Sequence, residues 1–202
     1  MNAVAENPSP FSIGDKILTC WNCGEMAGNC GILCPFCGAP LDFFGNYFEL
    51  FGLEIGYDID LDALESAYFR HQMKVHPDKF SGASTAVQIK AISLSSTLNN
   101  AYNLLNDNVK RGVYLLDLWG FDNILSRQDL VPEGLMMQQF ELRERAENEL
   151  DKASIKQDVL KRIDACHTIL NNACAADGSS LKRGINALFE LQFLTKFLKE
   201  IT

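Results

Sequence analysis

The chain has 202 residues, of which 47% are hydrophobic and 22% charged, so it can bury a core and hold one domain or two small ones. Its formal net charge of −8 argues against a nucleic-acid binder, because such binding depends on Lys and Arg side chains that neutralise phosphates. The sequence contains no apolar run near the roughly 18 residues of a membrane span, and its first residues resemble neither a secretory signal nor a transit peptide. We therefore expect a cytoplasmic protein that binds neither membranes nor nucleic acid.

The N-terminal part of the chain divides into a tail and a cysteine-rich module. Residues 1–17 are polar, contain two prolines and have no periodicity, which favours a flexible tail. Residues 18–44 are rich in Gly and Cys and too few to form a hydrophobic core of their own. This segment carries two C-x-x-C pairs, each followed by a glycine: Cys20 with Cys23, and Cys34 with Cys37. Four thiolates in two such pairs suit tetrahedral zinc, so we predict a zinc module with four cysteine ligands.

The next segment has long helical patterns, and the whole remainder of the chain is predicted to be all-α. One helix begins after Asp60, which suits an N-cap position, and must end before Pro77. A second helix spans about 85–105, and two amphipathic helices across a turn predict an antiparallel hairpin. The apolar segment 113–119 is expected to close this hairpin, giving a domain over residues 45–120.

The C-terminal part of the chain is predicted to be a three-helix bundle over residues 135–202. The helical period is lost in residues 121–134, which contain Gly, Pro and Asn and are interpreted as a linker. Three helical patterns follow, at about 135–151, 155–175 and 181–201.

The hairpin turn carries the tripeptide His76-Pro77-Asp78 at the end of a basic helix. The proline disfavours a helical conformation for His76, so the imidazole and the carboxylate are held on a rigid corner. Three cations give this acidic protein a local basic surface that suits an acidic patch on a partner: Arg70, Lys74 and Lys79. Taken alone, the tripeptide fits an ordinary helix-ending turn equally well.

The context of the tripeptide resembles the J-domain family. H-P-D lies between two amphipathic helices, and the second ends in LNNAYNLLNDNVKR, residues 98–111, a pattern similar to the end of the third J-domain helix. One departure is Asn108, where a proline is common in the family. The resemblance implies that the basic helix docks on a DnaK-type ATPase and that His76, Pro77 and Asp78 stimulate its ATP hydrolysis. Arg70, Lys74 and Lys79 are then docking residues.

Further strings resemble the HscB family of J-proteins, from about Asn46 to the C-terminus. They are HPDKFSG at 76–82, RGVYLLDLWG at 111–120 and ELRE at 141–144. The resemblance implies a co-chaperone that activates a DnaK/HscA-type ATPase and delivers to it the iron-sulfur scaffold protein IscU. Mitochondrial-type members carry a similar Cys-Trp-Asn-Cys-Gly module, which implies a structural metal and leaves the mitochondrial matrix as an alternative location.

Two bundle helices carry a second apolar stripe. On the first, Met136, Met137 and Phe140 lie roughly 130° from the stripe of Leu135 and Leu142. On the last helix, Phe189 and Phe193 point nearly opposite the leucine stripe. By themselves such stripes are either additional core or a partner site. The HscB resemblance implies a scaffold-binding site, with the contact residues Met136, Met137, Phe140, Glu141, Glu144 and Phe193.

Other chemistry is weakly supported. Cys30 is interpreted as a spare cysteine that can exchange with Cys34, and Cys166, His167 and Cys174 as inert core residues of the middle bundle helix. We expect no enzymatic activity, since the sequence offers no convincing set of nucleophile, base and orienting group. Two alternatives to the specialist co-chaperone stay open: a general J-protein for unfolded clients, and a zinc-ribbon nucleic-acid binder.

Overall fold

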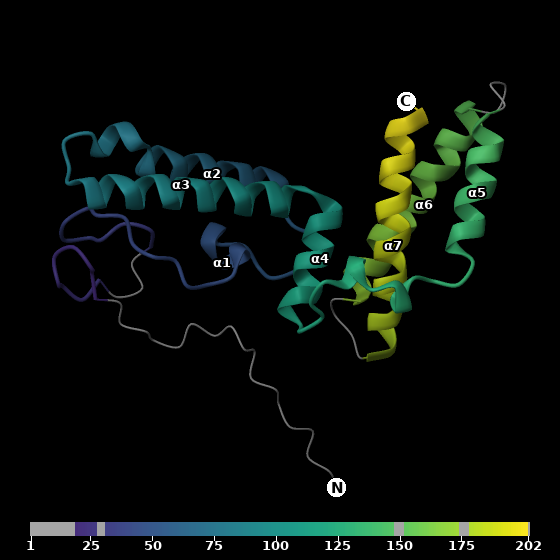
Figure 1. Cartoon of the computed structure of the whole chain (residues 1–202), viewed down its shortest axis with the longest axis horizontal. Helices are drawn as coiled ribbons and strands as arrows, with labels where there is room; N and C mark the ends of the chain where they lie inside the picture. The colour runs from purple at the N-terminus through teal and green to yellow at the C-terminus, as the bar shows by residue number, and fades with distance from the viewer. Residues whose placement is uncertain (1–18, 28–30, 148–151, 174–177, 202) are drawn as a thin grey trace, which may run out of the picture. The chain divides into compact units, whose positions relative to one another are not determined.

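The computed structural model describes residues 19–27, 31–147, 152–173 and 178–201 (Figure 1). The helices in chain order are α1 (Tyr47–Phe51), α2 (Leu61–Val75), η1 (Pro77–Phe80), α3 (Thr85–Asn106), α4 (Asn108–Leu118), η2 (Ile124–Ser126), η3 (Gln128–Leu130), α5 (Leu135–Ala146), α6 (Lys152–Ala173) and α7 (Gly178–Ile201). Extended pairing within the described ranges consists of two isolated antiparallel bridges, one in each half of the cysteine-rich segment. The predicted all-α fold is confirmed, whereas the predicted tail, residues 1–17, lies outside the described residues.

The chain forms two compact units, which are described separately. The first contains the described residues up to Glu54 together with Ile59–Asn106, and the second contains Ile55–Asp58 together with the described residues from Asp107 onward. Among the helices that the structure describes, none is both long enough and apolar enough to cross a membrane.

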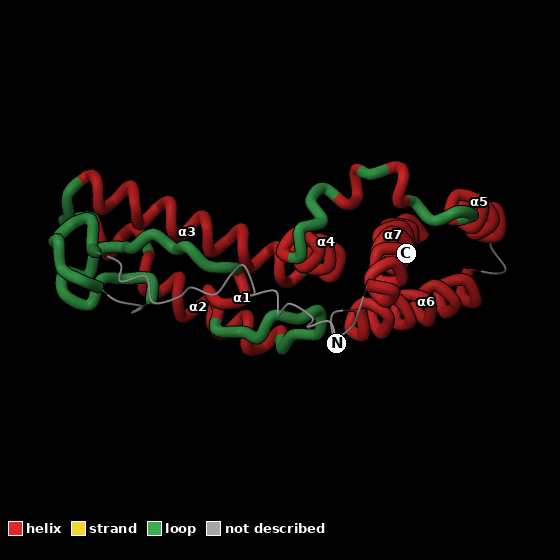
Figure 2. The backbone as a smooth tube through the Cα atoms, turned by 90° about the horizontal axis from the view of Figure 1, so that it is seen from below, coloured by secondary structure: helices red, strands yellow, loops and turns green. Residues whose placement is uncertain are grey.

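The first unit is built on an antiparallel hairpin of α2 and α3, which lie side by side in both ribbon views (Figures 1 and 2). The Asp60 side chain caps α2 by accepting a hydrogen bond from the Ala63 amide at 2.9 Å. The helix stops at Val75 because Pro77 follows two residues later and restricts the residue before it. The hairpin core consists of fully buried side chains from both helices, including Leu64, Val75, Leu98 and Leu105.

The second unit is organised around α7, which packs against α4, α5 and α6. Because this helix has neighbours on several sides, its apolar residues are buried in more than one direction: Ile185, Leu188, Phe189, Leu191, Phe193, Leu194 and Phe197. Helix α4 approaches α7 closely at Gly112, where a Cβ atom would lie 2.8 Å from the Leu188 Cδ1 atom.

The position of α4 differs from the prediction that residues 45–120 form one domain. The structure groups α4 with the bundle, because Leu115 and Leu116 lie with Leu170 and Leu181 around a small apolar space. The guanidinium of Arg111, only 5% exposed, adds a polar connection within this unit: its Nε donates to the Tyr57 carbonyl at 2.7 Å.

The segment predicted as a linker, 121–134, contains η2 and η3, and Ile124 within it is fully buried. The segment therefore contributes to the core of the second unit. The bundle helices agree with the prediction to within a few residues at their starts, since α6 begins at Lys152 and α7 at Gly178.

Candidate functional site

The His-Pro-Asp turn is a rigid corner with an exposed carboxylate. The backbone of His76 is extended, with φ −55° and ψ 129°, and Pro77 starts the 3-10 turn η1. The Asp78 amide donates a hydrogen bond to the His76 Nδ1 atom at 3.4 Å, and the Asp78 carboxylate lies 3.6 Å from the same atom. The side chain of Asp78 is 90% exposed. The turn thus holds a carboxylate on a short, proline-stiffened segment and displays it to solvent.

The predicted docking cations lie next to this turn. Arg70 and Lys74 are exposed one helical turn apart on α2, and Lys79 is exposed in η1. Phe69 and Met73 are also exposed on α2, by 54% and 63%, so apolar side chains alternate with the cations. Phe69 and Met73 were not among the predicted docking residues, although their spacing of four places them on a helix face away from the hairpin core.

A polar network fixes the register of the hairpin one to two turns before the tripeptide. The Gln72 amide group donates to the Ser95 carbonyl at 3.2 Å and to the Asn99 Oδ1 atom at 2.6 Å. The Tyr68 hydroxyl donates to the same Oδ1 atom at 2.8 Å, and its ring stacks on Tyr102 with centroids 4.4 Å apart. These contacts join α2 to α3 and set the direction in which α2 enters the turn.

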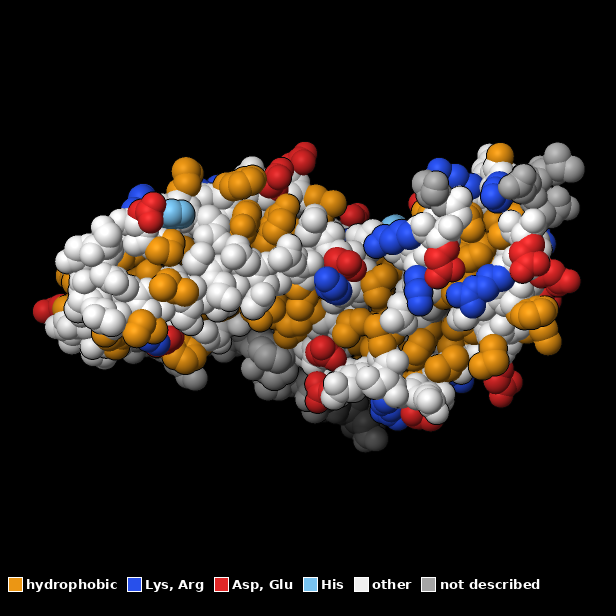
Figure 3. Space-filling model, turned by 45° about the horizontal axis from the view of Figure 1, so that its top comes forward, with side chains coloured by type: hydrophobic (Ala, Val, Ile, Leu, Met, Phe, Trp, Pro, Cys, Tyr) orange, Lys and Arg blue, Asp and Glu red, His pale blue; other side chains and the backbone are white. Residues whose placement is uncertain are grey.

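The predicted scaffold-binding residues of α5 form one exposed face, which we call the α5 surface: Met136, Met137, Phe140, Glu141 and Glu144. The three apolar side chains are 82%, 63% and 65% exposed, whereas Leu135 and Leu142 on the opposite face are buried. Figure 3 shows hydrophobic side chains beside acidic and basic ones over the region of α5, on the right of the view. Exposed apolar side chains next to carboxylates are typical of a contact surface for a protein with basic groups.

Phe193 differs from the other predicted contact residues, because it is only 8% exposed. Its ring stacks on Phe197 at 5.6 Å, and the Arg143 guanidinium lies 5.9 Å from its centroid. Since Arg143 belongs to α5, Phe193 supports that helix from within the unit. A helical wheel could not reveal this, because it does not show that α7 has three helices around it.

The four predicted metal ligands come together in one cluster. The sulfur atoms of Cys20, Cys23, Cys34 and Cys37 all lie within 4.8 Å of one another. The Cys20 and Cys37 sulfurs are 3.7 Å apart, and those of Cys23 and Cys34 are 3.8 Å apart. Thiolates about 2.3 Å from a tetrahedral zinc ion have sulfur–sulfur separations of about 3.8 Å. The cluster therefore has the ligand type, number and spacing of a structural metal site.

The backbone around the cluster forms two similar loops. After each C-x-x-C pair, Gly24 and Gly38 adopt φ values of 77° and 73°, a region that favours glycine. Each glycine amide donates to the carbonyl of the first cysteine of its pair, at 2.9 Å in both loops. The repeated geometry explains why a glycine follows each pair in the sequence.

The thiols of the cluster have unequal proton affinities. Hydrogen bonds from the Asn22 side chain and the Ala39 amide lower the pKa of Cys37 to about 6. The Glu25 amide acts to lower the pKa of Cys23, but desolvation and the neighbouring thiols raise it to about 12. Protons shared among four close sulfurs are released when a metal binds.

The remaining cysteines and histidines carry no comparable cluster among the described residues. Cys166 is 2% exposed, and its burial raises the pKa of the thiol to about 12, as expected for an inert core thiol. His167 Nε2 lies 3.3 Å from the Asn108 amide nitrogen, and burial lowers the pKa of this histidine. Cys30 and Cys174 lie outside the described residues.

Comparisons with known proteins identify relatives of this chain. The family model described as the HSCB C-terminal oligomerisation domain matches residues 131–202. The co-chaperone protein HscB of Proteus mirabilis (strain HI4320) is 30% identical over 161 residues, which are 77% of this chain and 93% of that protein.

Solved structures agree with this assignment. The chaperone HscB from Vibrio cholerae has a TM-score of 0.69 and 29% identity, covering 77% of this chain and 94% of that one. Human co-chaperone HscB has a TM-score of 0.78 over 91% of this chain and 96% of its own, and at 24% identity it shows a shared fold. The family resemblance predicted from the sequence is confirmed: the chain belongs to the HscB family and is a J-protein co-chaperone.

Proposed function

We propose that this co-chaperone stimulates ATP hydrolysis by a DnaK/HscA-type chaperone through its His-Pro-Asp turn and delivers the iron-sulfur scaffold protein IscU to it. The observation that carries the proposal is the proline-stiffened turn that exposes 90% of the Asp78 side chain beside a cationic helix. The chemical step belongs to the partner ATPase, and this chain supplies a fixed carboxylate and imidazole at its surface.

The turn is suited to act on a partner because it changes little on contact. Pro77 restricts the backbone, and the hydrogen bond from the Asp78 backbone amide to His76 Nδ1 orients the imidazole beside the Asp78 carboxylate. Little conformational entropy is therefore lost when Asp78 pairs with a cationic group of the chaperone. Arg70, Lys74 and Lys79 add attraction to an acidic surface and speed the encounter.

The test is a titration of the cognate chaperone's ATPase with the wild-type chain and with His76→Gln, Asp78→Asn and Asp62→Asn. His76 and Asp78 are mostly exposed, so both turn variants should keep their helicity while stimulation is lost. Asp62→Asn makes the same chemical change at the exposed start of α2 and should leave stimulation near the wild-type level. Stimulation that persists in His76→Gln contradicts the proposal.

We propose the α5 surface as the site that holds the scaffold. Its apolar side chains cost free energy when exposed to water, and a partner that covers them recovers this cost. Methionine adapts its shape to a partner, and Glu141 and Glu144 can pair with basic groups. Phe193 is proposed to contribute by supporting α5 from beneath. A general J-protein for unfolded clients is the alternative, and a pull-down that recovers heterogeneous clients would favour it.

We further propose that the cysteine cluster holds one structural zinc ion. Borderline-soft zinc prefers thiolates, and the sulfur separations match its tetrahedral geometry. We expect a zinc content near one per chain, lost in Cys20→Ser and Cys37→Ser but retained in the matched variant Cys166→Ser. Native protein without bound metal would contradict the assignment. The cytoplasmic location stays a prediction.

A further inference from the structure

A cavity lies between the cysteine module and the tip of the helical hairpin, within the first unit. It has a volume of about 340 Å³ and opens to the surface. We call it the junction cavity. The module side is lined by Asn22, Cys37, Gly38 and Ala39, and the hairpin side by Phe80, Ala83, Ser84 and Val87.

The hairpin side of the junction cavity is continuous with the His-Pro-Asp turn. Phe80 is the last residue of η1, the same four-residue turn that contains Pro77 and Asp78. The Lys79 amide donates to the His76 carbonyl at 2.9 Å, so this turn is closed on itself. Because η1 is short and internally bonded, a shift of Phe80 also moves Asp78.

The loop that follows η1 is held from α3. The Gln88 side chain donates to the Ser81 and Ala83 carbonyls, at 3.1 Å each. These bonds restrain the loop on the side of α3, while the module borders it across the junction cavity. The loop is therefore bonded to α3 on one side and faces the second cysteine loop across the junction cavity on the other.

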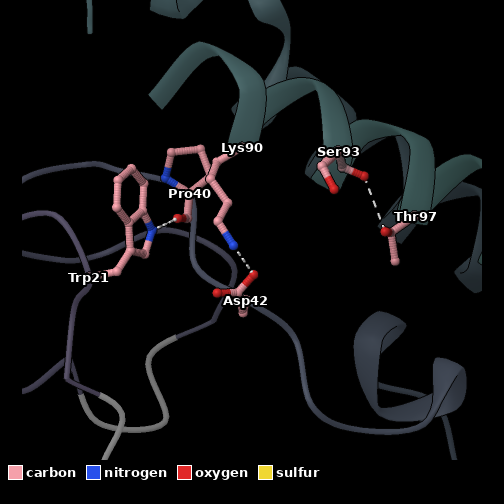
Figure 4. A network of polar contacts seen from close by, with 6 residues as sticks. All are labelled: Trp21, Pro40, Asp42, Lys90, Ser93 and Thr97. Carbon is pink, nitrogen blue, oxygen red and sulfur yellow. Dashed lines mark hydrogen bonds and ion pairs between the residues drawn. The ribbon is translucent and has the colours of Figure 1, made fainter. Parts of the chain in front are cut away.

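The module is fastened to α3 close to this cavity (Figure 4). Lys90 forms an ion pair with Asp42, which follows the second cysteine loop. The Trp21 indole nitrogen donates to the Pro40 carbonyl at 2.8 Å and links the first loop to the same segment. Lys90 lies three residues after Val87, which lines the cavity, so the ion pair joins the module to α3 near the cavity.

The module has little to hold it together besides a metal. Its buried side chains among the described residues are few and mostly small, and two of them are predicted ligand cysteines: Cys20, Ala27, Ile32, Cys34, Ala39 and Leu41. So small an apolar cluster cannot offset the conformational entropy of ordering the segment. Loss of the metal is thus expected to release Cys37, Gly38 and Ala39 from the wall of the junction cavity.

We propose that the cysteine module is a positioning element for the His-Pro-Asp turn. With metal bound, the second cysteine loop supports Phe80 and narrows the motion of Pro77 and Asp78. Metal occupancy then regulates how well the turn engages a chaperone. The regulatory part rests on the proposed ATPase stimulation, whereas the positioning part concerns this chain alone.

The test compares the full chain in four forms: zinc-loaded wild type, Cys37→Ser, Lys90→Met and Cys166→Ser. The first measurement is amide hydrogen exchange over residues 79–87 without chaperone, with residues 98–105 of α3 as internal reference. We expect exchange at 79–87 to rise about tenfold or more in Cys37→Ser, as in a locally opened segment. Lys90→Met keeps all four cysteines of the cluster and should raise the exchange rate at 79–87 about two- to fivefold, because an exposed ion pair contributes only modestly to stability. Cys166→Ser should match the wild type.

The second measurement is the co-chaperone concentration that gives half-maximal ATPase stimulation. We expect it to rise in Cys37→Ser and less in Lys90→Met, in the same order as the exchange rates. Unchanged exchange at 79–87 in a metal-free Cys37→Ser chain overturns the proposal. If Cys37→Ser unfolds the hairpin as a whole, the Lys90→Met variant is the deciding test. Exchange at 79–87 equal to that of the wild type in Lys90→Met then overturns the proposal. Failure of the wild type to stimulate any ATPase would refute the proposed function instead, while the exchange result still tests positioning.

Discussion

Replacing Met137 and Phe140 together by alanine should weaken scaffold binding while leaving the folded chain intact. The two side chains are 63% and 65% exposed on α5, so truncation removes little packing within the unit. Alanine also has a higher helix propensity than either residue, which favours retention of α5. The free energy of unfolding should therefore change by less than about 1 kcal/mol.

The expected loss of affinity follows from the exposed fraction. Full burial of a Met or Phe side chain contributes about 1.5–3 kcal/mol, and about two thirds of each remains available to a partner. The pair should therefore contribute about 2–4 kcal/mol to binding, which corresponds to a rise in Kd of about 30- to 1,000-fold. Isothermal titration calorimetry with the IscU scaffold measures this directly.

Two matched variants separate contact from packing. Leu160→Ala removes an apolar side chain that is 43% exposed on α6, outside the α5 surface, and should leave Kd unchanged. Leu142→Ala removes a buried side chain of α5 itself and should lower stability by about 2–5 kcal/mol. Phe193→Ala should likewise lower stability, because Phe193 is buried. Wild-type affinity in the Met137 and Phe140 double variant would refute the assignment of the surface.

Three further predictions concern stability. Gly112→Ala places a Cβ atom 2.8 Å from the Leu188 side chain, and the resulting overpacking should cost about 1–3 kcal/mol. This cost should exceed the gain of about 1 kcal/mol in helix propensity, so the free energy of unfolding measured by urea denaturation should fall. Gly184→Ala should cost more in the same assay, because its Cβ would lie 2.8 Å from an alanine Cβ that moves only with its backbone. Burial lowers the pKa of both His71 and His167, so the unfolded chain binds more protons than the folded chain as the pH falls below about 6.5. The melting temperature measured by thermal unfolding should therefore fall as the pH is lowered below about 6.5. This fall should be smaller in His167→Gln than in the wild type. A melting temperature independent of pH between about 7 and 5 in the wild type would contradict this linkage.

The sequence by itself determined the features that depend on local chemistry. Asp60 predicted the start of α2 and Pro77 its end, because capping and proline geometry act within a few residues. The doubled C-x-x-C pairs predicted the sulfur cluster, since metal-ligand spacing is carried by two short loops. The exposed stripe of α5 was also visible, because one face of that helix suffices for packing.

Only the tertiary structure decided what depends on neighbours distant in the chain. The stripe of Phe193 on α7 looks like the stripe on α5, yet α7 is surrounded by three helices and buries it. Helix α4 joins the bundle because Gly112 permits close approach to Leu188. These two residues are 76 positions apart in the sequence, so no local pattern encodes their contact. The junction cavity arises in the same way, since packing alone brings the second cysteine loop beside Phe80.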